Sequence, residues 1–176
     1  MAAGTTYEPI TTTTLSSAAS SVTFSSITGS YTDLVLVSNY KPTAGCVLYL
    51  QVGNGSIDTG SNYSTILLSG YGVSGKTSWR YVNQTSMYIG PQNVSTTTAV
   101  FTTSIANIQS YSNSNTYKFI LSRYNSAYDV SNGLSETVLN INSWRSASAI
   151  NTVKIYPSTG NFDIGSNFTL YRIAAA

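Results

Sequence analysis

Residues 70–77 carry a glycine pattern that binds phosphate groups in other proteins. The segment reads Gly-Tyr-Gly-Val-Ser-Gly-Lys-Thr, so it matches both the phosphate-binding loop and the dinucleotide fingerprint. Both motifs require a helix directly after the glycines, because its N-terminal amides hold the phosphates. Residues 78–83 are instead aromatic and β-branched, and no acid between Asp58 and Asp129 is present to bind a ribose. We interpret the segment as a connection between two strands, with Lys76 in solvent.

The side chains that most enzymes use for acid, base or nucleophilic steps are scarce. The chain has no histidine, and Cys46 is its single cysteine. This inventory excludes Cys/His zinc sites and Ser-His-Asp or Cys-His nucleophiles. The six acids are widely spread, and residues 129–136 lack the alternating ligands of a calcium-binding EF-hand loop. We therefore expect no enzyme, no cofactor and no metal site.

Charge and hydropathy narrow the choice of partners. The formal net charge is +2, and the eight basic residues are scattered singly, so no basic stripe is available to neutralise a phosphate backbone. No apolar run approaches the roughly 20 residues that span a bilayer, and the first residues lack the pattern of a secretion signal. We expect no nucleic-acid partner, no membrane partner and synthesis in a cytoplasm.

The elements that would position any functional side chain are predicted to be strands. Ser, Thr, Asn, Gly and Tyr dominate, whereas strong helix formers are rare. About ten short strands separated by turn residues predict an all-β fold, either an antiparallel β-sandwich or a jelly roll. The expected strands cover residues 21–24, 33–39, 47–52, 65–68, 79–83, 99–103, 117–123, 137–144, 150–156 and 168–173.

Alternation within these segments predicts which side chains are buried. Leu139 and Ile141 alternate with Asn140 and Asn142, as expected for a strand with one buried apolar face and one wet polar face. Residues 34–37 are continuously apolar, which is typical of a central strand covered on both sides.

The N-terminal part of the chain differs from the rest. Residues 11–21 are mostly Thr, Ser and Ala, with no charged side chain. We expect residues 1–20 to form an extended N-terminal arm and residues 21–176 to form a single β-sandwich domain. Termini of this composition seldom order alone, so we expect them to lie against neighbouring subunits or within an assembly.

Seven segments form an ordered series along nearly the whole chain. They are residues 7–10, 11–27, 31–37, 60–64, 117–123, 143–151 and 165–171. In their order and approximate spacing they resemble a family of small β-rich virion structural proteins of tailed bacteriophages, common in aquatic phages and including cyanophages. Two features depart from that family: Arg172 stands where relatives often have Gly, and residues 70–77 replace a variable Gly/Ser loop.

The resemblance implies a structural role on the virion and no catalytic residue. The leading expectation is a capsid decoration, or cement, protein, a homotrimer that binds the major capsid protein on the outer shell. A tail-fibre or baseplate component that binds a host-surface glycan is the alternative, and a small hydrolase that uses Asp129 or Glu136 is a third. The candidate interface residues are Tyr7, Leu15, Tyr71, Trp79, Tyr81 and Tyr88.

Overall fold

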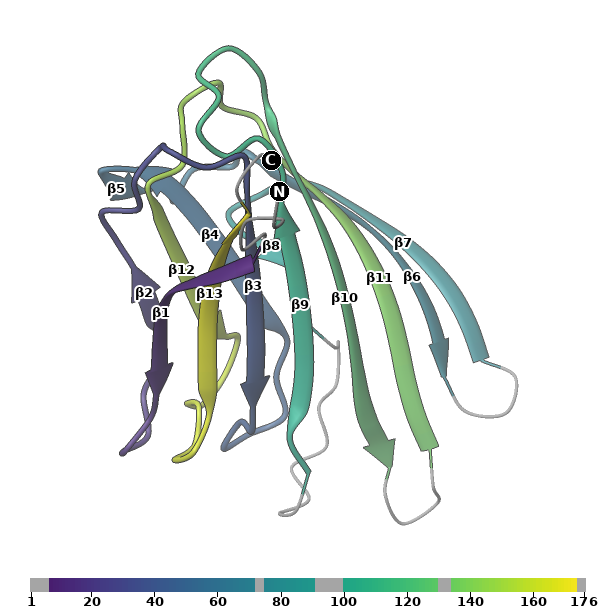
Figure 1. Ribbon diagram of the computed structural model, residues 1–176. Coiled ribbons are helices and arrows are strands. Elements are labelled where there is room, and N and C mark those ends of the chain that lie inside the picture. Colours follow the sequence, from purple (N-terminus) through teal and green to yellow (C-terminus); the bar gives the residue numbers. More distant parts are fainter. Residues whose placement is uncertain (1–6, 72–74, 91–99, 130–133, 174–176) are drawn as a thin grey trace, which may run out of the picture.

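The protein is built from strands throughout the part that can be described. The computed structural model describes residues 7–71, 75–90, 100–129 and 134–173, apart from the side chains of residues 71, 126–129 and 134. Every regular element in these ranges is a β-strand (Figure 1). The prediction of an all-β fold is therefore confirmed. None of the described residues forms a helix that could cross a membrane.

The strands form two antiparallel sheets of unequal size, consistent with a β-sandwich. In the order in which they pair, the strands of the large sheet are β1 (Tyr7–Thr14), β13 (Asn167–Ile173), β3 (Asp33–Tyr40), β9 (Thr102–Ile108), β10 (Lys118–Asp129), β11 (Leu134–Trp144), β6 (Tyr63–Tyr71) and β7 (Gly75–Gln84). The small sheet consists of β2 (Val22–Phe24), β12 (Thr152–Pro157), β4 (Leu48–Asn54) and β5 (Ser56–Ile57), with β8 (Met87–Tyr88) also paired to β4.

The main hydrophobic core lies between the two sheets. Strand β3 contributes Leu34 and Leu36, and β4 contributes Leu50 from the opposite layer; all three are fully buried. Strand β3 lies centrally in the large sheet, between β13 and β9, as its apolar sequence predicts. On the other face of β3, Val35 is buried and Val37 is partly buried, so this strand is covered unevenly on its second side.

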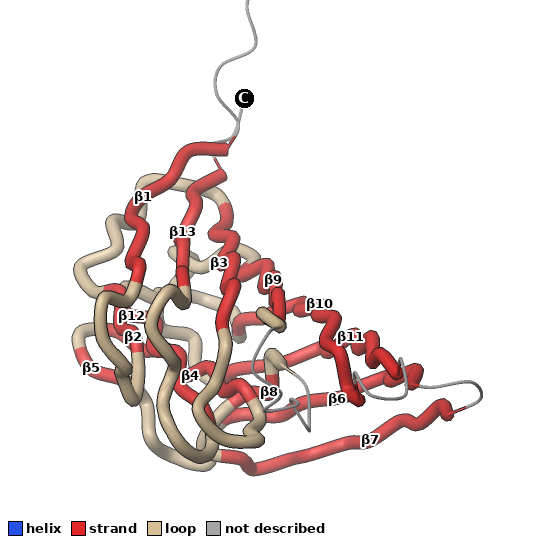
Figure 2. The backbone as a smooth tube through the Cα atoms, turned by 90° about the horizontal axis from the view of Figure 1, so that it is seen from below, coloured by secondary structure: helices blue, strands red, loops and turns tan. Residues whose placement is uncertain are grey.

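Four strands of the large sheet extend beyond the small sheet. Strands β10 and β11 pair as one hairpin, and β6 and β7 pair as another. The two hairpins lie together at one end of the strand order, and they project sideways from the sandwich (Figures 1 and 2). We call these four strands, β10, β11, β6 and β7, the wing.

The expected N-terminal arm differs from the structure over residues 7–14. These residues form β1, an edge strand that pairs with β13 and contains a bulge between Pro9 and Thr11. The backbone of Leu15 then exchanges hydrogen bonds with the segment before β13, donating to the Ser166 carbonyl at 2.9 Å. The physical reason is that β-branched threonines favour a paired strand even without large apolar side chains. Residues 1–6 of the expected arm lie outside the described residues.

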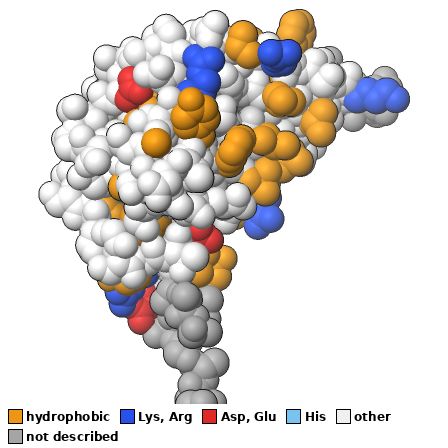
Figure 3. Space-filling model, turned by 90° about the horizontal axis from the view of Figure 1, so that it is seen from above, with side chains coloured by type: hydrophobic (Ala, Val, Ile, Leu, Met, Phe, Trp, Pro, Cys, Tyr) orange, Lys and Arg blue, Asp and Glu red, His pale blue; other side chains and the backbone are white. Residues whose placement is uncertain are grey.

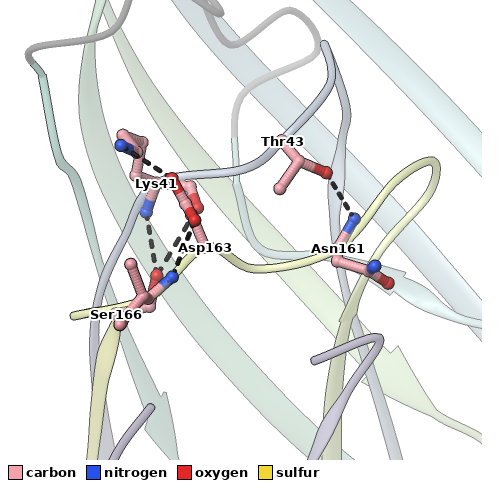
Figure 4. A network of polar contacts seen from close by, with 6 residues as sticks. Lys41, Thr43, Asn161, Asp163 and Ser166 are labelled. Atoms are coloured by element: carbon pink, nitrogen blue, oxygen red, sulfur yellow. Dashed lines mark hydrogen bonds and ion pairs between the residues drawn. The ribbon is translucent and has the colours of Figure 1, made fainter. Parts of the chain in front are cut away.

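Polar contacts fasten the loops at one end of the sandwich (Figure 4). Lys41 Nζ lies 2.7 Å from Asp163 Oδ2, and the Asp163 amide donates to the Lys41 carbonyl at 2.8 Å. The Asn161 amide donates to Thr43 Oγ1 at 2.9 Å. The hydrogen bond from Lys41, followed by one from the Ile164 amide, holds the pKa of Asp163 below its usual value. These contacts link the segment after β3 to the segment before β13.

Each of the ten expected strands has a counterpart. The largest displacement is at residues 99–103, where the strand begins at residue 102 and continues to residue 108. Strands β5 and β8 were not expected, and each has only two residues. Pairing to β4, rather than a sequence pattern of their own, defines them.

The two tryptophans occupy opposite environments and provide a test of the fold. Trp144 is 3% exposed and its Nε1 donates to Asp58 Oδ2 at 2.7 Å, whereas Trp79 is 53% exposed. Burial acts to raise the pKa of Asp58, but hydrogen bonds from Trp144, Asn62 and the Gly60 amide outweigh it and lower that pKa.

We expect Trp144→Phe to lower the free energy of unfolding by about 2 kcal/mol, because a hydrogen bond to a charged group is lost. The matched variant Trp79→Phe should stay within about 0.5 kcal/mol of the wild type. Urea unfolding of both variants at pH 7 measures the difference. Equal losses in the two variants would contradict the assigned environment of Trp144.

Candidate functional site

The wing exposes large apolar side chains on the face that turns away from the small sheet. Ile66 of β6 pairs with Ile141 of β11, which pairs with Leu121 of β10. In the next row, Leu68 pairs with Leu139. Phe119 of β10 and the five residues just named are each between 38% and 55% exposed. We call this surface the outer face; it consists of Ile66, Leu68, Phe119, Leu121, Leu139 and Ile141.

The opposite face of the wing, which we call the inner face, is buried, and it combines polar side chains with an apolar cluster of Leu67, Tyr124 and Val138. Thr65 Oγ1 donates to Asn142 Oδ1 at 2.6 Å, and the Asn140 and Asn142 amides each donate to Ser122 Oγ, at 3.3 and 3.4 Å. Asn140 is 1% exposed and Asn142 is completely buried. An antiparallel sheet that borders a core normally buries its apolar face and exposes its polar one. Along β11 the wing shows the reverse arrangement, since Asn140 and Asn142 are buried while Leu139 and Ile141 are exposed.

This reversal corrects the assignment made from alternation in β11. Leu139 and Ile141 were expected on the buried face, and Asn140 and Asn142 on the wet one. The alternation itself is present, but the Asn side chains face inward and the apolar pair faces outward. The physical reason is that Asn142 finds hydrogen-bond partners on β6 and β10. Asn140 donates to Ser122 on β10, although its Oδ1 has no partner in the described part of the chain.

The outer face is shallow and has basic residues beside its apolar centre. A hollow of about 90 Å³ lies by Ile66, Phe119 and Ile141, far smaller than the several hundred Å³ of typical small-molecule sites. Arg80 pairs with Ile66 and Arg123 pairs with Leu139, so both arginines belong to the same face. This shape suits the surface of another macromolecule better than an enclosed small molecule. In Figure 3 the projecting part of the molecule shows orange and blue side chains.

A buried carboxylate lies at the far end of the inner face. Glu136 is 7% exposed, and its Oε1 accepts a 2.9 Å hydrogen bond from Ser69 Oγ. Its Oε2 has no hydrogen-bond partner in the described part of the chain. Burial raises the pKa of Glu136, and the bond from Ser69 only partly opposes that rise.

A cluster of tyrosines joins the wing to the small sheet. The rings of Tyr81 on β7 and Tyr88 on β8 stack with centroids 4.6 Å apart, and Tyr49 on β4 meets Tyr88 edge-on at 5.1 Å. Tyr81 also packs on the buried cluster that contains Leu67 and Val138. Burial, the largest cause, raises the pKa of Tyr88 well above its usual value. These contacts fix the wing relative to the sandwich.

The six candidate interface residues do not come together in one place. Tyr7 is exposed at the start of β1, whereas Leu15 packs partly buried against the main core. Trp79 is exposed on β7, while Tyr81 and Tyr88 stack on each other. Tyr71 ends β6, but its side chain lies outside the described residues. The outer face was not expected from the sequence, although the alternation of residues 139–142 separated the side chains of β11 into two faces.

The glycine pattern at residues 70–77 falls on the hairpin between β6 and β7. Tyr71 pairs with Gly75, and both Lys76, which is exposed, and Thr77, which is partly buried, already belong to β7. A strand therefore follows the glycines, as expected, and not the helix that phosphate binding by these motifs requires. Residues 72–74 lie outside the described residues. Residues 130–133 of the faint calcium-loop pattern lie outside them too, between the paired strands β10 and β11.

Comparison with known proteins gives no relative. No protein-family model matches the chain, and no curated protein and no solved structure shows significant similarity to it.

Two adjacent residues of β11 test the reversed faces. Val138→Thr should lower the free energy of unfolding by about 1–3 kcal/mol, because it buries a hydroxyl beside Leu67 and Tyr124. Leu139→Thr should change it by less than about 0.5 kcal/mol, since Leu139 faces outward. Urea denaturation of the two variants makes the comparison. A larger loss for Leu139→Thr would show that the buried and exposed faces are the other way round.

Glu136 gives a pH-dependent prediction. Its folded-state pKa is raised, so folding favours the protonated form, and stability falls as pH rises through that pKa. Glu136→Gln should therefore stabilise the protein by about 1 kcal/mol at pH 7, with the gain vanishing below its ordinary pKa of 4.5.

Asp163→Asn is the control for this titration. The pKa of Asp163 is lowered, so its contribution to stability is present above 3.8 and is lost as pH falls further. Thermal unfolding from pH 3 to pH 8 measures both variants. At neutral pH, Glu136→Gln should raise the melting temperature and Asp163→Asn should lower it. If Glu136→Gln is less stable than the wild type at pH 7, the description of Glu136 as a buried carboxylate that folding destabilises in its charged form is wrong.

Proposed function

We propose that the protein is a non-enzymatic virion structural protein that decorates a phage capsid. In this proposal the outer face docks on the major capsid protein of the assembled shell, and the protein resides on the virion. The reversed wing is the observation that supports this role, because monomeric proteins seldom expose contiguous apolar patches unless they bind something. Binding only the assembled shell would stabilise that shell by mass action.

We further propose that the sandwich is a jelly roll into which the wing is inserted. The chain alternates between the sheets, from β1 to β2, β3 and β4, then through β8 and β9 to β12 and β13. The large sheet contains the order β1-β13-β3-β9, while β2-β12-β4-β8 runs through the small one. This order supports a jelly roll, in which eight strands form two Greek keys. Viral capsid and lectin domains share that architecture.

The alternative role is a tail-fibre or baseplate component that binds a host-surface glycan. Trp79 supports it, because its half-exposed indole on β7 could stack on a sugar ring. Tyr81 and Tyr88 support it less, since their stacked rings cover each other. The outer face consists of aliphatic side chains and one phenyl ring, which suits a protein partner better than a polar sugar.

Copy number on purified virions tests the proposed function. Particles of the phage that encodes this chain would be imaged by cryo-electron microscopy, and the chain quantified against the major capsid protein by mass spectrometry. A decoration protein should occur in hundreds of copies on a regular lattice over the head. Tens of copies confined to the tail would favour the glycan-binding alternative, and absence from the particles would overturn both virion roles.

A further inference from the structure

We infer that the outer face binds an acidic surface of a different protein rather than a second copy of this chain. This inference deepens the proposed docking role and, for its natural partner, rests on that proposal. Three observations carry it: the reversed wing, the basic residues on the outer face, and the engagement of the chain's own carboxylates.

Three basic residues share the outer face with its apolar centre. Arg80 lies beside Ile66, Arg123 lies beside Leu139 and Ile105, and Lys76 lies beside Gly70. The paired partners place all three in the phase of Ile66 and Leu68, and all three are exposed. None of them forms an ion pair with another described residue. A partner that covers this face must therefore supply negative charge, or the buried cations lose solvation without compensation.

The chain's own described carboxylates are already engaged elsewhere. Glu8 pairs with Arg172, Asp163 pairs with Lys41, and Asp58 accepts three hydrogen bonds. The other two have partners as well.

Asp33 Oδ1 accepts a 2.6 Å hydrogen bond from the Ser110 amide, and buried Glu136 accepts one from Ser69. The side chain of Asp129 lies outside the described residues. Two outer faces placed against each other would bring two sets of basic residues together with no described carboxylate to compensate them, which is unfavourable. A second copy therefore fits this face poorly, and the expected homotrimer would have to use another surface.

The dimensions of the face fit a protein interface. Six side chains with 38% to 55% exposure amount to an apolar area on the order of 500 Å², within the roughly 300–600 Å² of the largest patch on a typical monomer, which is often functional. With the surrounding polar residues this approaches the roughly 800 Å² that each partner buries in a standard complex. The partner surface should accordingly have an apolar centre with Asp or Glu around it, the usual pairing of a hydrophobic core and a polar rim.

Zero-length cross-linking identifies the partner on virions. A carbodiimide activates a carboxylate, and the Lys76 amine then attacks the activated carbonyl to form an amide. The reagent leaves as its urea, which accounts for the water lost in the coupling. Peptide mass spectrometry of cross-linked virions should find Lys76 joined to an Asp or Glu of another virion protein. A link from Lys76 to a second copy of this chain would overturn the inference, while leaving a virion role intact.

Charge reversal tests the role of the basic residues. Arg123→Glu should weaken binding to virions grown without this gene at least tenfold at about 50 mM salt, and higher salt should weaken wild-type binding. Lys154→Glu is the matched control, because Lys154 lies on the small sheet, paired with Thr23 and Gln51. It makes the same change in net charge and should bind like the wild type. Equal binding by Arg123→Glu and the wild type would overturn the inference.

A virion-free assay separates this inference from the proposed function. NMR titration with a synthetic peptide of alternating Glu and Leu should shift signals of Arg123 and Leu139, whereas the corresponding Lys and Leu peptide should not. Vesicles containing 30% phosphatidylglycerol and a 20-base-pair DNA should also leave these signals unchanged. Equal response to both peptides, or stronger binding to vesicles or DNA, would overturn the inference. A wild-type protein that binds the acidic peptide but not virions would refute the proposed function alone.

Discussion

The register between β10, β11 and β6 is the constraint on which the outer face depends. Successive side chains of a strand point to opposite faces, so a shift of one residue would exchange the two faces of the wing. The exchanged register would bury Leu139 and Ile141, but it would expose Val138 and its buried neighbours Leu67 and Tyr124. The inward hydrogen bonds of Asn142 to Thr65 and Ser122 oppose it. Because unpaired buried amides are costly, these bonds, together with the buried Leu67–Tyr124–Val138 cluster, fix the phase of all three strands.

The same wing is held rigidly against the sandwich. Trp144 reaches from the end of β11 to Asp58, and the Tyr81–Tyr88 stack connects β7 with the small sheet. The Tyr88 amide also donates to Thr65 Oγ1 at 3.3 Å, which links the small sheet to the buried polar network. A face held in one orientation before binding loses little conformational entropy when a partner covers it. The contacts on the buried side of the wing thus hold the exposed apolar side in one orientation.

The sequence predicts the strands of this fold better than it predicts their orientation. Period-two alternation indicated β11 as a strand, because that pattern is local. Which phase faces the core depends on partners distant in the chain, such as Thr65 for Asn142, and no local pattern contains that information. Strand β1 was missed because threonine-rich segments also occur in flexible tails. Tyr81 and Tyr88 were sensible interface candidates, yet they contact each other.

An exposed apolar sheet face creates a risk of aggregation in the free chain. Arg80 and Arg123 reduce that risk, because two such faces in contact would gather positive charge on both sides. The same side chains would favour a partner that has carboxylates around an apolar centre. One pair of residues would therefore discourage self-association and select the partner, and the engagement of the carboxylates that the structure describes makes both effects possible. The charges on the outer face would accordingly determine mainly which partner binds, while the aliphatic side chains would supply most of the area that binding removes from water.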